Sequence, residues 1–317
     1  MKVKKERNFN RINDFLENNN GLIFHDVQFN LIISKYINSS FYYFAIYRNK
    51  QIVGACPIHE ISNHKYAGLM NWGVPYGGWV LEKGQVNIKK AFRYNKIGLL
   101  EVLHYWSNPF NENEKEYFIN RKANVYETPI IQLQKSSNQI FKEYVSKNTR
   151  HNIRRATKKG VVVHEINTKE ELNIFIHLKH ELDNKVGLNS FSKDLYYDLY
   201  DAYFNTGNLK ALIAYFDNVP VSGLLLLAKG SIVHAWAAGR KNEIPNSIYQ
   251  NELLWWNSIE WAIKNSYKYY DLCVVQRDKL PKIAQFKMGF SKRLIQFYSC
   301  SKKTIFYRII RKLNLIK

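Results

Sequence analysis

The 317-residue sequence has few cysteines, few prolines and no long hydrophobic run, and each shortage excludes a class of protein. Its three cysteines, Cys56, Cys273 and Cys300, form no CxxC pair, which argues against a disulfide framework or a structural zinc site. Seven prolines and fifteen glycines exclude collagen-like and proline-rich architectures. No apolar run approaches the about 18 residues of a membrane span, and no apolar segment follows the basic N-terminus as in a signal peptide. We therefore expect a cytoplasmic protein in a reducing compartment.

Acidic residues are also scarce, with 26 Asp and Glu against 47 Lys and Arg, so the formal net charge is +21. Such a chain favours anionic partners, which include nucleic acid, phosphorylated metabolites and an acidic membrane face. Part of the excess is also explained by a composition rich in Lys, Asn, Ile and Tyr, as an AT-rich genome produces. An apolar fraction of 46% excludes global disorder, and the length favours two domains of roughly 150 residues.

Periodicity and turn residues predict alternating helices and strands. In the first half we expect a mostly helical start at 1–38, a hairpin at 41–58, a strand–turn–strand at 68–81, a helix at 84–98, a strand at 99–106, a polar loop at 108–116 and a strand at 126–133. In the second half we expect a helical, basic segment at 138–160, a strand at 160–166, helices at 168–186 and 192–206, and three strands within 209–239. After these we expect a helix at 246–265, a strand at 267–275, a short helix at 283–290, a strand at 293–300 and a basic helix at 302–314.

The two halves share an internal repeat. Residues 47–54 (YRNKQIVG) align with 216–223 (FDNVPVSG), and in each half helices precede an antiparallel meander that a helix and a strand follow. This order resembles that of a GNAT-type acyltransferase domain. We therefore predict an α+β fold of two tandem GNAT-like domains, each a mixed, mostly antiparallel sheet flanked by helices. The expected domains are 1–145 and 146–300, followed by a basic amphipathic helix at 301–317.

Several segments, in order along nearly the whole chain, resemble the Fem family of peptidoglycan cross-bridge aminoacyl transferases and their GNAT-like relatives encoded with surface-polysaccharide genes. They are 24–26 (FHD), 76–78 (YGG), 146–161 (SKNTRHNIRRATKKGV), 236–239 (WAAG), 251–256 (NELLWW), 259–262 (IEWA), 270–272 (YDL) and 286–290 (FKMGF). The chain departs from the family pattern at Cys273, where glycine is usual, at Ser291, and at Asn108, where larger members carry an acid. It also has no room for their coiled-coil arm, so it resembles the compact members.

The resemblance implies an acyl or aminoacyl transferase that modifies an amine of a cell-envelope precursor, such as a nucleotide- or lipid-linked sugar or a muropeptide. Two alternatives stay open: an acyl-CoA-dependent N-acyltransferase acting on an amino sugar of a surface polysaccharide, and a non-catalytic RNA-binding protein. The usual GNAT pyrophosphate loop, Q/R-x-x-G-x-G/A, is missing, which argues against an ordinary acetyl-CoA enzyme. We expect no tightly bound cofactor, and an acyl donor that is either acyl-CoA or aminoacyl-tRNA.

Two residues are candidates for catalysis. Lys287 lies between two aromatic residues, where its ammonium would stabilise negative charge on the acyl carbonyl or a donor phosphate, as the resemblance also implies; the alternative is a surface lysine with a buried stem. Asp271 lies near the end of an apolar strand, where a raised pKa would make it a general base toward an amine; the alternative is an aspartate that caps a turn.

The basic helix and its neighbours are candidates for substrate binding. Lys147, Arg150, Arg154 and Lys158 share one helix face, and the arginine fork suits phosphate oxygens, although a solvated surface helix has the same pattern. The substrate-binding set is Tyr76, Lys147, Asn148, Arg150, Arg154, Arg155, Trp236, Tyr249 and Asn251, of which Trp236, Tyr249 and Asn251 line an acceptor pocket if the resemblance holds.

Other features favour structural roles or an added partner. His177 and His180 are three residues apart, not four as in helical zinc pairs, so we expect no metal site, and we expect His104 and His234 to be structural. The tail at 302–317 is basic and amphipathic, which fits a peripheral contact with an anionic membrane at its inner face, or packing on the second domain.

Overall fold

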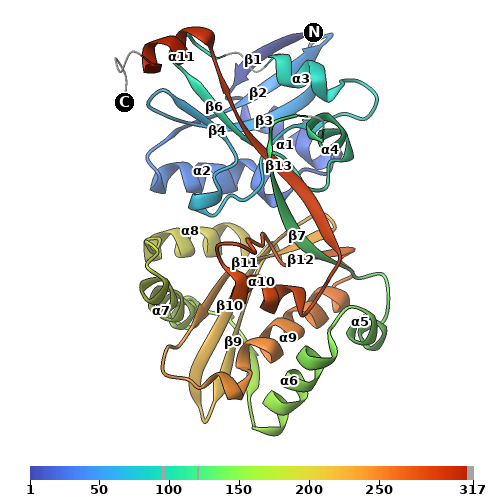
Figure 1. Ribbon diagram of the computed structural model, residues 1–317, viewed down its shortest axis with the longest axis vertical. Helices are drawn as coiled ribbons and strands as arrows, with labels where there is room; N and C mark the ends of the chain where they lie inside the picture. Colours follow the sequence, from blue (N-terminus) through green and yellow to red (C-terminus); the bar gives the residue numbers. More distant parts are fainter. Residues whose placement is uncertain (95–96, 120, 313–317) are drawn as a thin grey trace. The chain divides into compact units, whose positions relative to one another are not determined.

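The computed structural model describes residues 1–94, 97–119 and 121–312 (Figure 1). The chain forms two compact units, one of Met1–Glu127 with Ile295–Lys317 and one of Thr128–Leu294. Parts of the helices expected at 84–98 and 302–314 fall outside the described residues. No described helix is both long enough and apolar enough to cross a bilayer.

Unit 1 is a mixed sheet with strands in the order β1-β2-β3-β4-β6-β13, in which β4 and β6 are parallel and β5 pairs with β3. Its strands are β1 (Lys2–Glu6), β2 (Ser40–Arg48), β3 (Gln51–Ile61), β4 (His64–Ala67), β5 (Val80–Leu81), β6 (Val102–Trp106) and nearly all of β13 (Leu294–Lys303). Its helices are α1 (Phe9–Asn18), α2 (Val27–Tyr36), α3 (Ile88–Tyr94), α4 (Glu112–Phe118) and α11 (Ile305–Lys312), with short 3-10 turns at Ile23–His25 and Met70–Trp72.

Unit 2 is a second mixed sheet, in the order β7-β12-β11-β10-β9-β8, in which β11 and β12 are parallel. Its strands are β7 (Asn124–Gln132, which begins in unit 1), β8 (Val162–Glu165), β9 (Leu209–Phe216), β10 (Val219–Lys229), β11 (Ile232–Arg240) and β12 (Tyr269–Asp271). Its helices are α5 (Ser137–Glu143), α6 (Lys147–Lys158), α7 (Lys169–Val186), α8 (Lys193–Tyr203), α9 (Gln250–Lys264) and α10 (Pro281–Met288), with a 3-10 turn at Asn246–Ile248.

The two sheets exchange their last strands. In unit 2, β12 pairs with β11 on one side and with β7, from the end of the first half, on the other. In unit 1, β6 pairs with β4 on one side and with β13, from the end of the second half, on the other. The unit boundaries therefore fall at 127/128 and 294/295, and not at the 145/146 and 300/301 expected from the sequence. Helix α11 follows β13 directly and is part of unit 1, where the sequence suggested a separate segment or packing on the second domain.

The internal repeat is real but shifted by one residue from the sequence alignment. Both hairpins turn through two residues with positive φ, Asn49 (48°) and Lys50 (65°) in one and Asp217 (50°) and Asn218 (60°) in the other. In each hairpin, the register of pairing between the two strands shifts at the third residue of the second strand, which is Val53 in β3 and Val221 in β10. Turn and register shift coincide only when Asn49 is matched to Asp217, so Gly54 corresponds to Ser222 and not to Gly223.

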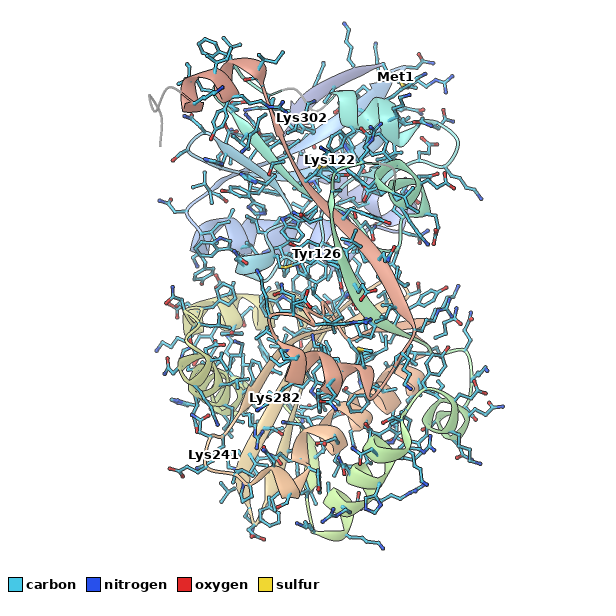
Figure 2. All side chains as sticks on the ribbon, viewed as in Figure 1. Met1, Lys122, Tyr126, Lys241, Lys282 and Lys302 are labelled. Carbon is cyan, nitrogen blue, oxygen red and sulfur yellow. The ribbon has the colours of Figure 1, made fainter. Side chains whose placement is uncertain are left out.

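Helices cover the sheet of unit 2, and side chains fill the space between the layers (Figure 2). The core gathers leucines of β10 with Trp255, Trp256 and Ile259 of α9. Gly239 ends the WAAG segment because α7 crosses it closely: a Cβ at this position would lie 2.5 Å from the backbone nitrogen of Lys179. Ser146 caps α6, and its N–H donates to the carbonyl of Gly289 at 2.8 Å, so the connector and FKMGF segments meet.

Some local expectations were wrong for identifiable reasons. The polar stretch at 108–116 is not all loop, because Asn111 caps a helix with Glu112 and Glu114 in its first turn. The helical segment expected at 138–160 is confirmed, as two helices separated at Ser146, which caps the second one. The strand expected at 267–275 pairs over three residues only, and 68–81 contains one short strand, β5.

Candidate active site

The candidate active site of unit 2 begins where β11 and β12 end their parallel pairing. The register places His234 of β11 directly opposite Asp271 of β12, and both side chains are fully buried. Nδ1 of His234 lies 2.7 Å from Oδ2 of Asp271. A buried carboxylate needs donors around it, and this pairing supplies one that stabilises the ionised aspartate.

Asp271 accepts two further hydrogen bonds. The Thr128 hydroxyl of β7 donates to Oδ1, and the N–H of Cys273 donates to the same oxygen at 2.8 Å. Burial alone would raise the pKa of Asp271, but the hydrogen bonds from His234, Thr128 and Cys273 outweigh it and hold the pKa below its usual value. The raised pKa expected from the sequence was therefore wrong in direction.

The chain turns sharply after β12 and presents two carbonyls to Lys287 of α10. Cys273 has φ of 58°, a left-handed conformation that favours glycine. Nζ of Lys287 donates to the carbonyls of Cys273 at 3.2 Å and Val274 at 3.1 Å. Burial lowers the pKa of Lys287, although the nearby Cys273 and Asp271 oppose the shift. The two candidates for catalysis, Lys287 and Asp271, therefore both bond to the backbone of the turn that follows β12.

His234, Asp271 and Cys273 are the described group whose donor atoms lie close enough together to hold a metal ion, within 4.8 Å of one another. Nitrogen, oxygen and sulfur donors of this kind suit zinc. Here the three side chains contact each other, since Sγ of Cys273 lies 3.9 Å from Oδ2 of Asp271, which also accepts from His234. Burial raises the pKa of the Cys273 thiol well above its usual value, so the group is a hydrogen-bonded network with a protonated thiol.

Helix α6 supplies cations to the loop at 240–249, which joins β11 to α9. Nη1 of Arg155 donates to the Tyr249 hydroxyl at 3.1 Å, and its guanidinium lies 4.9 Å from the centre of that ring. Nζ of Lys159 donates to the carbonyl of Ser247 at 2.9 Å. The sequence candidates Arg155 and Tyr249 are therefore in direct contact.

The other cations of α6 have different surroundings. Nη1 of Arg150 donates to the carbonyls of Lys142 at 2.9 Å and Val145 at 2.5 Å, at the C-terminal end of α5. Arg154 is exposed, with its guanidinium 5.6 Å from the centre of the Phe141 ring, and Lys147 and Asn148 are exposed at the start of the helix. Arg150 thus connects two helices, while Arg154 and Lys147 face solvent.

The remaining binding candidates lie outside α10, which carries Lys287. Trp236 of β11 packs near Phe191 and Tyr196, and Asn251 is half-buried in the first turn of α9. Tyr76 is fully buried in unit 1, edge-on to Phe24 and Phe297. Of the helical histidines, His177 is exposed and His180 contacts the carbonyl of Phe191 at 2.9 Å.

The loop at 240–249 lacks the features of a diphosphate cradle. It contains no glycine, and Nη2 of Arg240, at its start, donates to Ile244 and Asn246 of the loop itself. The next residue of the loop is Lys241, which Figure 2 labels. Glu252 places a carboxylate in the first turn of α9, where a bound anion would need positive potential.

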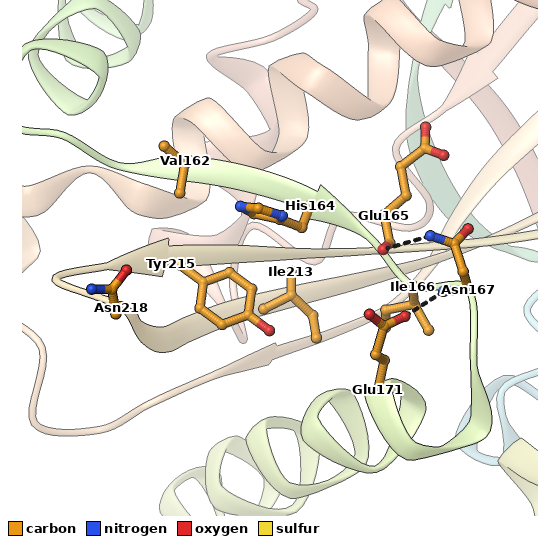
Figure 3. A pocket seen from close by; sticks show the side chains of 9 residues that line it. All are labelled: Val162, His164, Glu165, Ile166, Asn167, Glu171, Ile213, Tyr215 and Asn218. Carbon is orange, nitrogen blue, oxygen red and sulfur yellow. Dashed lines mark hydrogen bonds between the residues drawn. The ribbon is translucent and has the colours of Figure 1, made fainter.

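A pocket of about 580 Å³ lies at the other edge of the same sheet (Figure 3). It is lined by residues of β8, β9 and the start of α7, among them His164, Tyr215, Glu165 and Glu171. Its charged side chains are acidic, which does not suit a phosphate, and β10 and β11 separate its strands from β12 in the sheet.

His234 and Thr128 are the site residues that sequence reasoning missed. Both lie on strands whose apolar neighbours marked them as core, and 37 and 143 residues separate them from Asp271. A histidine inside a run of apolar strand residues was the available signal, because a buried imidazole needs a partner.

Comparison with known families gives a match within the second half of the chain. A family model of the acetyltransferase (GNAT) domain matches residues 145–287, which include His234, Asp271 and Lys287. No curated protein matches the chain significantly.

Solved structures share the fold of the whole chain at low sequence identity. FemX superposes with a TM-score of 0.69 at 13% identity, covering 99% of both chains. L-PGS from Bacillus licheniformis gives 0.56 at 11%, covering 99% of this chain and 98% of that one. The C-terminal domain of a putative lysylphosphatidylglycerol synthetase from Agrobacterium fabrum gives 0.55 at 7%, covering 97% and 94%. These structures confirm the α+β fold of GNAT-like units expected from the sequence. The family model at residues 145–287 confirms the acyltransferase class.

Proposed function

The chain carries a GNAT acyltransferase domain at residues 145–287, and we propose that it transfers an aminoacyl group from aminoacyl-tRNA to an amine of a phosphate-bearing cell-envelope precursor. The observation that carries this proposal is the position of Lys287, held by two carbonyls of the turn after β12 beside the Asp271–His234 pair. In the step itself, the acceptor amine nitrogen bonds to the donor carbonyl carbon, and the ester C–O bond breaks. The amine loses one proton and the leaving oxygen gains one.

Lys287 has the chemistry for the charged intermediate of this step. As an ammonium it stabilises the negative oxygen that forms on the attacked carbonyl. The lowered pKa that burial gives it also eases donation of a proton to the leaving oxygen. Asp271 is ionised and enclosed by three donors, so in this proposal it holds the turn and His234 in place and does not touch the amine itself.

The surroundings of the 240–249 loop favour the aminoacyl donor over a coenzyme A thioester. A glycine-free loop followed by Glu252 is a poor diphosphate site, whereas the exposed cations of α6 suit an extended phosphate backbone. FemX and the lysylphosphatidylglycerol synthetase domain share the fold, and the second name describes an amino acid joined to a phospholipid, which fits an acceptor that carries phosphate.

The donor is tested by incubating the purified protein with charged tRNA or with coenzyme A thioesters, and with nucleotide- and lipid-linked amine acceptors. We expect acyl product from charged tRNA and a thermal shift with the same donor. Product from a thioester alone would favour the alternative, acyl-CoA-dependent N-acylation of an amino sugar. Tight tRNA binding without product from any donor would contradict the proposal and favour the alternative of a non-catalytic RNA-binding protein.

The role of Lys287 is tested with a control on the same helix. Lys287→Ala should lower kcat about 100-fold or more, because an oxyanion donor is lost, and should lower the unfolding free energy by only about 1–2 kcal/mol, because two carbonyls lose a charged donor. Lys282→Ala changes an exposed lysine of α10 (Figure 2) and should leave kcat unchanged. Equal kcat for the two variants would contradict the proposal.

A further inference from the structure

Helix α11 places apolar side chains in solvent on the side away from its own unit. Among the described side chains of α11, Tyr307 is buried, and at about 100° per residue Ile305 and Ile309 lie opposite to it. Ile305 is 77% exposed and Ile309 is 52% exposed, with Phe306 exposed next to them. In a soluble protein such a cluster on one short helix usually marks a binding surface.

A neighbouring segment extends this apolar surface. The Thr304 hydroxyl, just before α11, donates to the carbonyl of Leu99, which brings the two segments into contact. Leu99 is 67% exposed, and Leu100 is also exposed. Two separate parts of the chain therefore contribute exposed branched aliphatic side chains.

The charged residues of α11 and of the strand end just before it are all basic, and Glu101, which follows Leu100, is paired with Lys65. Arg308 and Lys312 are exposed on the flank of the same helix face, and Lys303 precedes the helix on β13. The sequence contains no Asp or Glu from Lys279 to the end of the chain, so no acidic residue of this segment offsets these cations. Aliphatic side chains flanked by lysine and arginine are the composition of helices that lie in the interface of an anionic bilayer.

We propose that this surface, made of Leu99, Leu100, Ile305, Phe306, Ile309, Arg308 and Lys312, docks the protein on anionic phospholipid. The aliphatic side chains enter the boundary between headgroups and acyl chains, and the cations contact lipid phosphates. The proposal is independent of the acyl donor, because all seven residues belong to unit 1 and the acyl-transfer site belongs to unit 2.

The test is co-sedimentation of the full chain with vesicles of phosphatidylglycerol and phosphatidylcholine, and with vesicles of phosphatidylcholine alone. The wild type should bind the anionic vesicles, and binding should weaken at high salt because the phosphate contacts are screened. Ile305→Ser with Ile309→Ser should weaken binding at least about tenfold, and Arg308→Gln with Lys312→Gln should do the same. All variants should keep the melting temperature and the transfer of acyl groups to a water-soluble acceptor.

Matched controls come from exposed residues of unit 2. Val186→Ser with Leu188→Ser removes two exposed aliphatic side chains, and Lys193→Gln with Lys264→Gln removes two exposed cations. Neither pair should change vesicle binding. Failure of the wild type to bind, or equal losses in the controls, would overturn the proposal. A change in oligomeric state by light scattering without a change in vesicle binding would assign the surface to a protein contact instead.

Discussion

At Cys273 the backbone conformation favours glycine, whereas the buried position favours a side chain that fills space. Its φ of 58° favours glycine, yet its side chain is buried beside Asp271. The sequence comparison already marked this position as a departure from a glycine, and the backbone explains why glycine is suited to it. The turn matters for function because it carries the two carbonyls that hold Lys287.

Substitutions at Cys273 should separate the energy of its backbone conformation from the energy of burying its side chain. In Cys273→Gly the relief of the left-handed backbone, about 1 kcal/mol, offsets the loss of a small buried side chain, so the unfolding free energy should stay within about 1 kcal/mol of the wild type. Cys273→Val should lose about 2 kcal/mol or more, because a β-branched residue tolerates positive φ poorly. Urea denaturation measures both values.

Cys56 provides the control for that comparison. It is fully buried in β3, an extended strand where valine is favoured, so Cys56→Val should cost less than Cys273→Val. If the two valine variants were equally stable, backbone strain at Cys273 would have no measurable energy.

Among single residues, the sequence identified the two charged residues of the site but not the two uncharged partners of Asp271. Lys287 and Asp271 could be found because each interrupts an apolar segment with a charge. His234 and Thr128 could not, because their contacts with Asp271 depend on the register of β11 and β7 against β12, and register is set by packing of the whole sheet. The pKa direction of Asp271 was missed for the same reason, since it follows from those donors.

Among the elements, α6 combines two uses of arginine that the sequence pattern could not separate. Arg150, Arg154 and Lys147 share the helix face read as a phosphate-binding stripe. Nη1 of Arg150 instead donates to carbonyls at the end of α5, where cations also interact favourably with the helix dipole. Arg154 has its guanidinium in solvent near one aromatic ring.

This difference predicts different phenotypes for two alanine variants. Arg150→Ala should lower the unfolding free energy by about 1–2 kcal/mol, because partly buried carbonyls lose a charged donor. Arg154→Ala should change stability by less than about 0.5 kcal/mol and weaken the binding of an anionic ligand, with a smaller salt dependence. Denaturation and binding titrations at two salt concentrations measure both. Loss of stability in Arg154→Ala without loss of binding would contradict the assignment of α6 as a phosphate surface.

The exchange of β7 and β13 between the units was beyond sequence reasoning. Both strands were predicted, at 126–133 and 293–300, with nearly correct bounds. A short apolar strand has the same pattern whichever sheet it joins, so the sequence assigned each to the half that contains it. Only the pairing of β7 with β12 and of β13 with β6 shows that each unit is completed by the other half of the chain.

For the molecule as a whole, the buried carboxyl of Glu114 links global stability to pH. Its side chain is fully buried in unit 1, where it accepts hydrogen bonds from the Tyr105 hydroxyl, from the Trp79 N–H at 3.0 Å and from the Asn108 N–H at 2.6 Å. Burial raises the pKa of Glu114 to about 7 against the opposing effect of these donors. Between pH 4.5 and about 7 the native state therefore holds a proton that the unfolded chain has released.

The sign of the effect follows from that proton. Stability contributed by Glu114 is present at low pH and is lost as pH rises through its folded-state pKa, by up to about 3 kcal/mol. Two histidines act in the opposite direction: burial lowers the pKa of His59 to about 3 and of His104 to about 4, so their contribution to stability grows as pH rises toward 6.5 and is fully present above it. The total pH profile mixes these contributions, and a variant is needed to isolate Glu114.

Glu114→Gln supplies that variant, because glutamine resembles the protonated carboxyl and does not titrate. The unfolding free energy of the wild type minus that of Glu114→Gln should fall as pH rises from 5 to 8, while the histidine contributions cancel in the difference. Urea denaturation at four pH values across this range measures it, with Glu112→Gln, an exposed residue of the same helix, as the control that should give a flat difference. A difference that is equally flat for Glu114→Gln would mean that the carboxyl ionises in the folded state at least as easily as in water, so that its three donors balance or exceed the effect of burial.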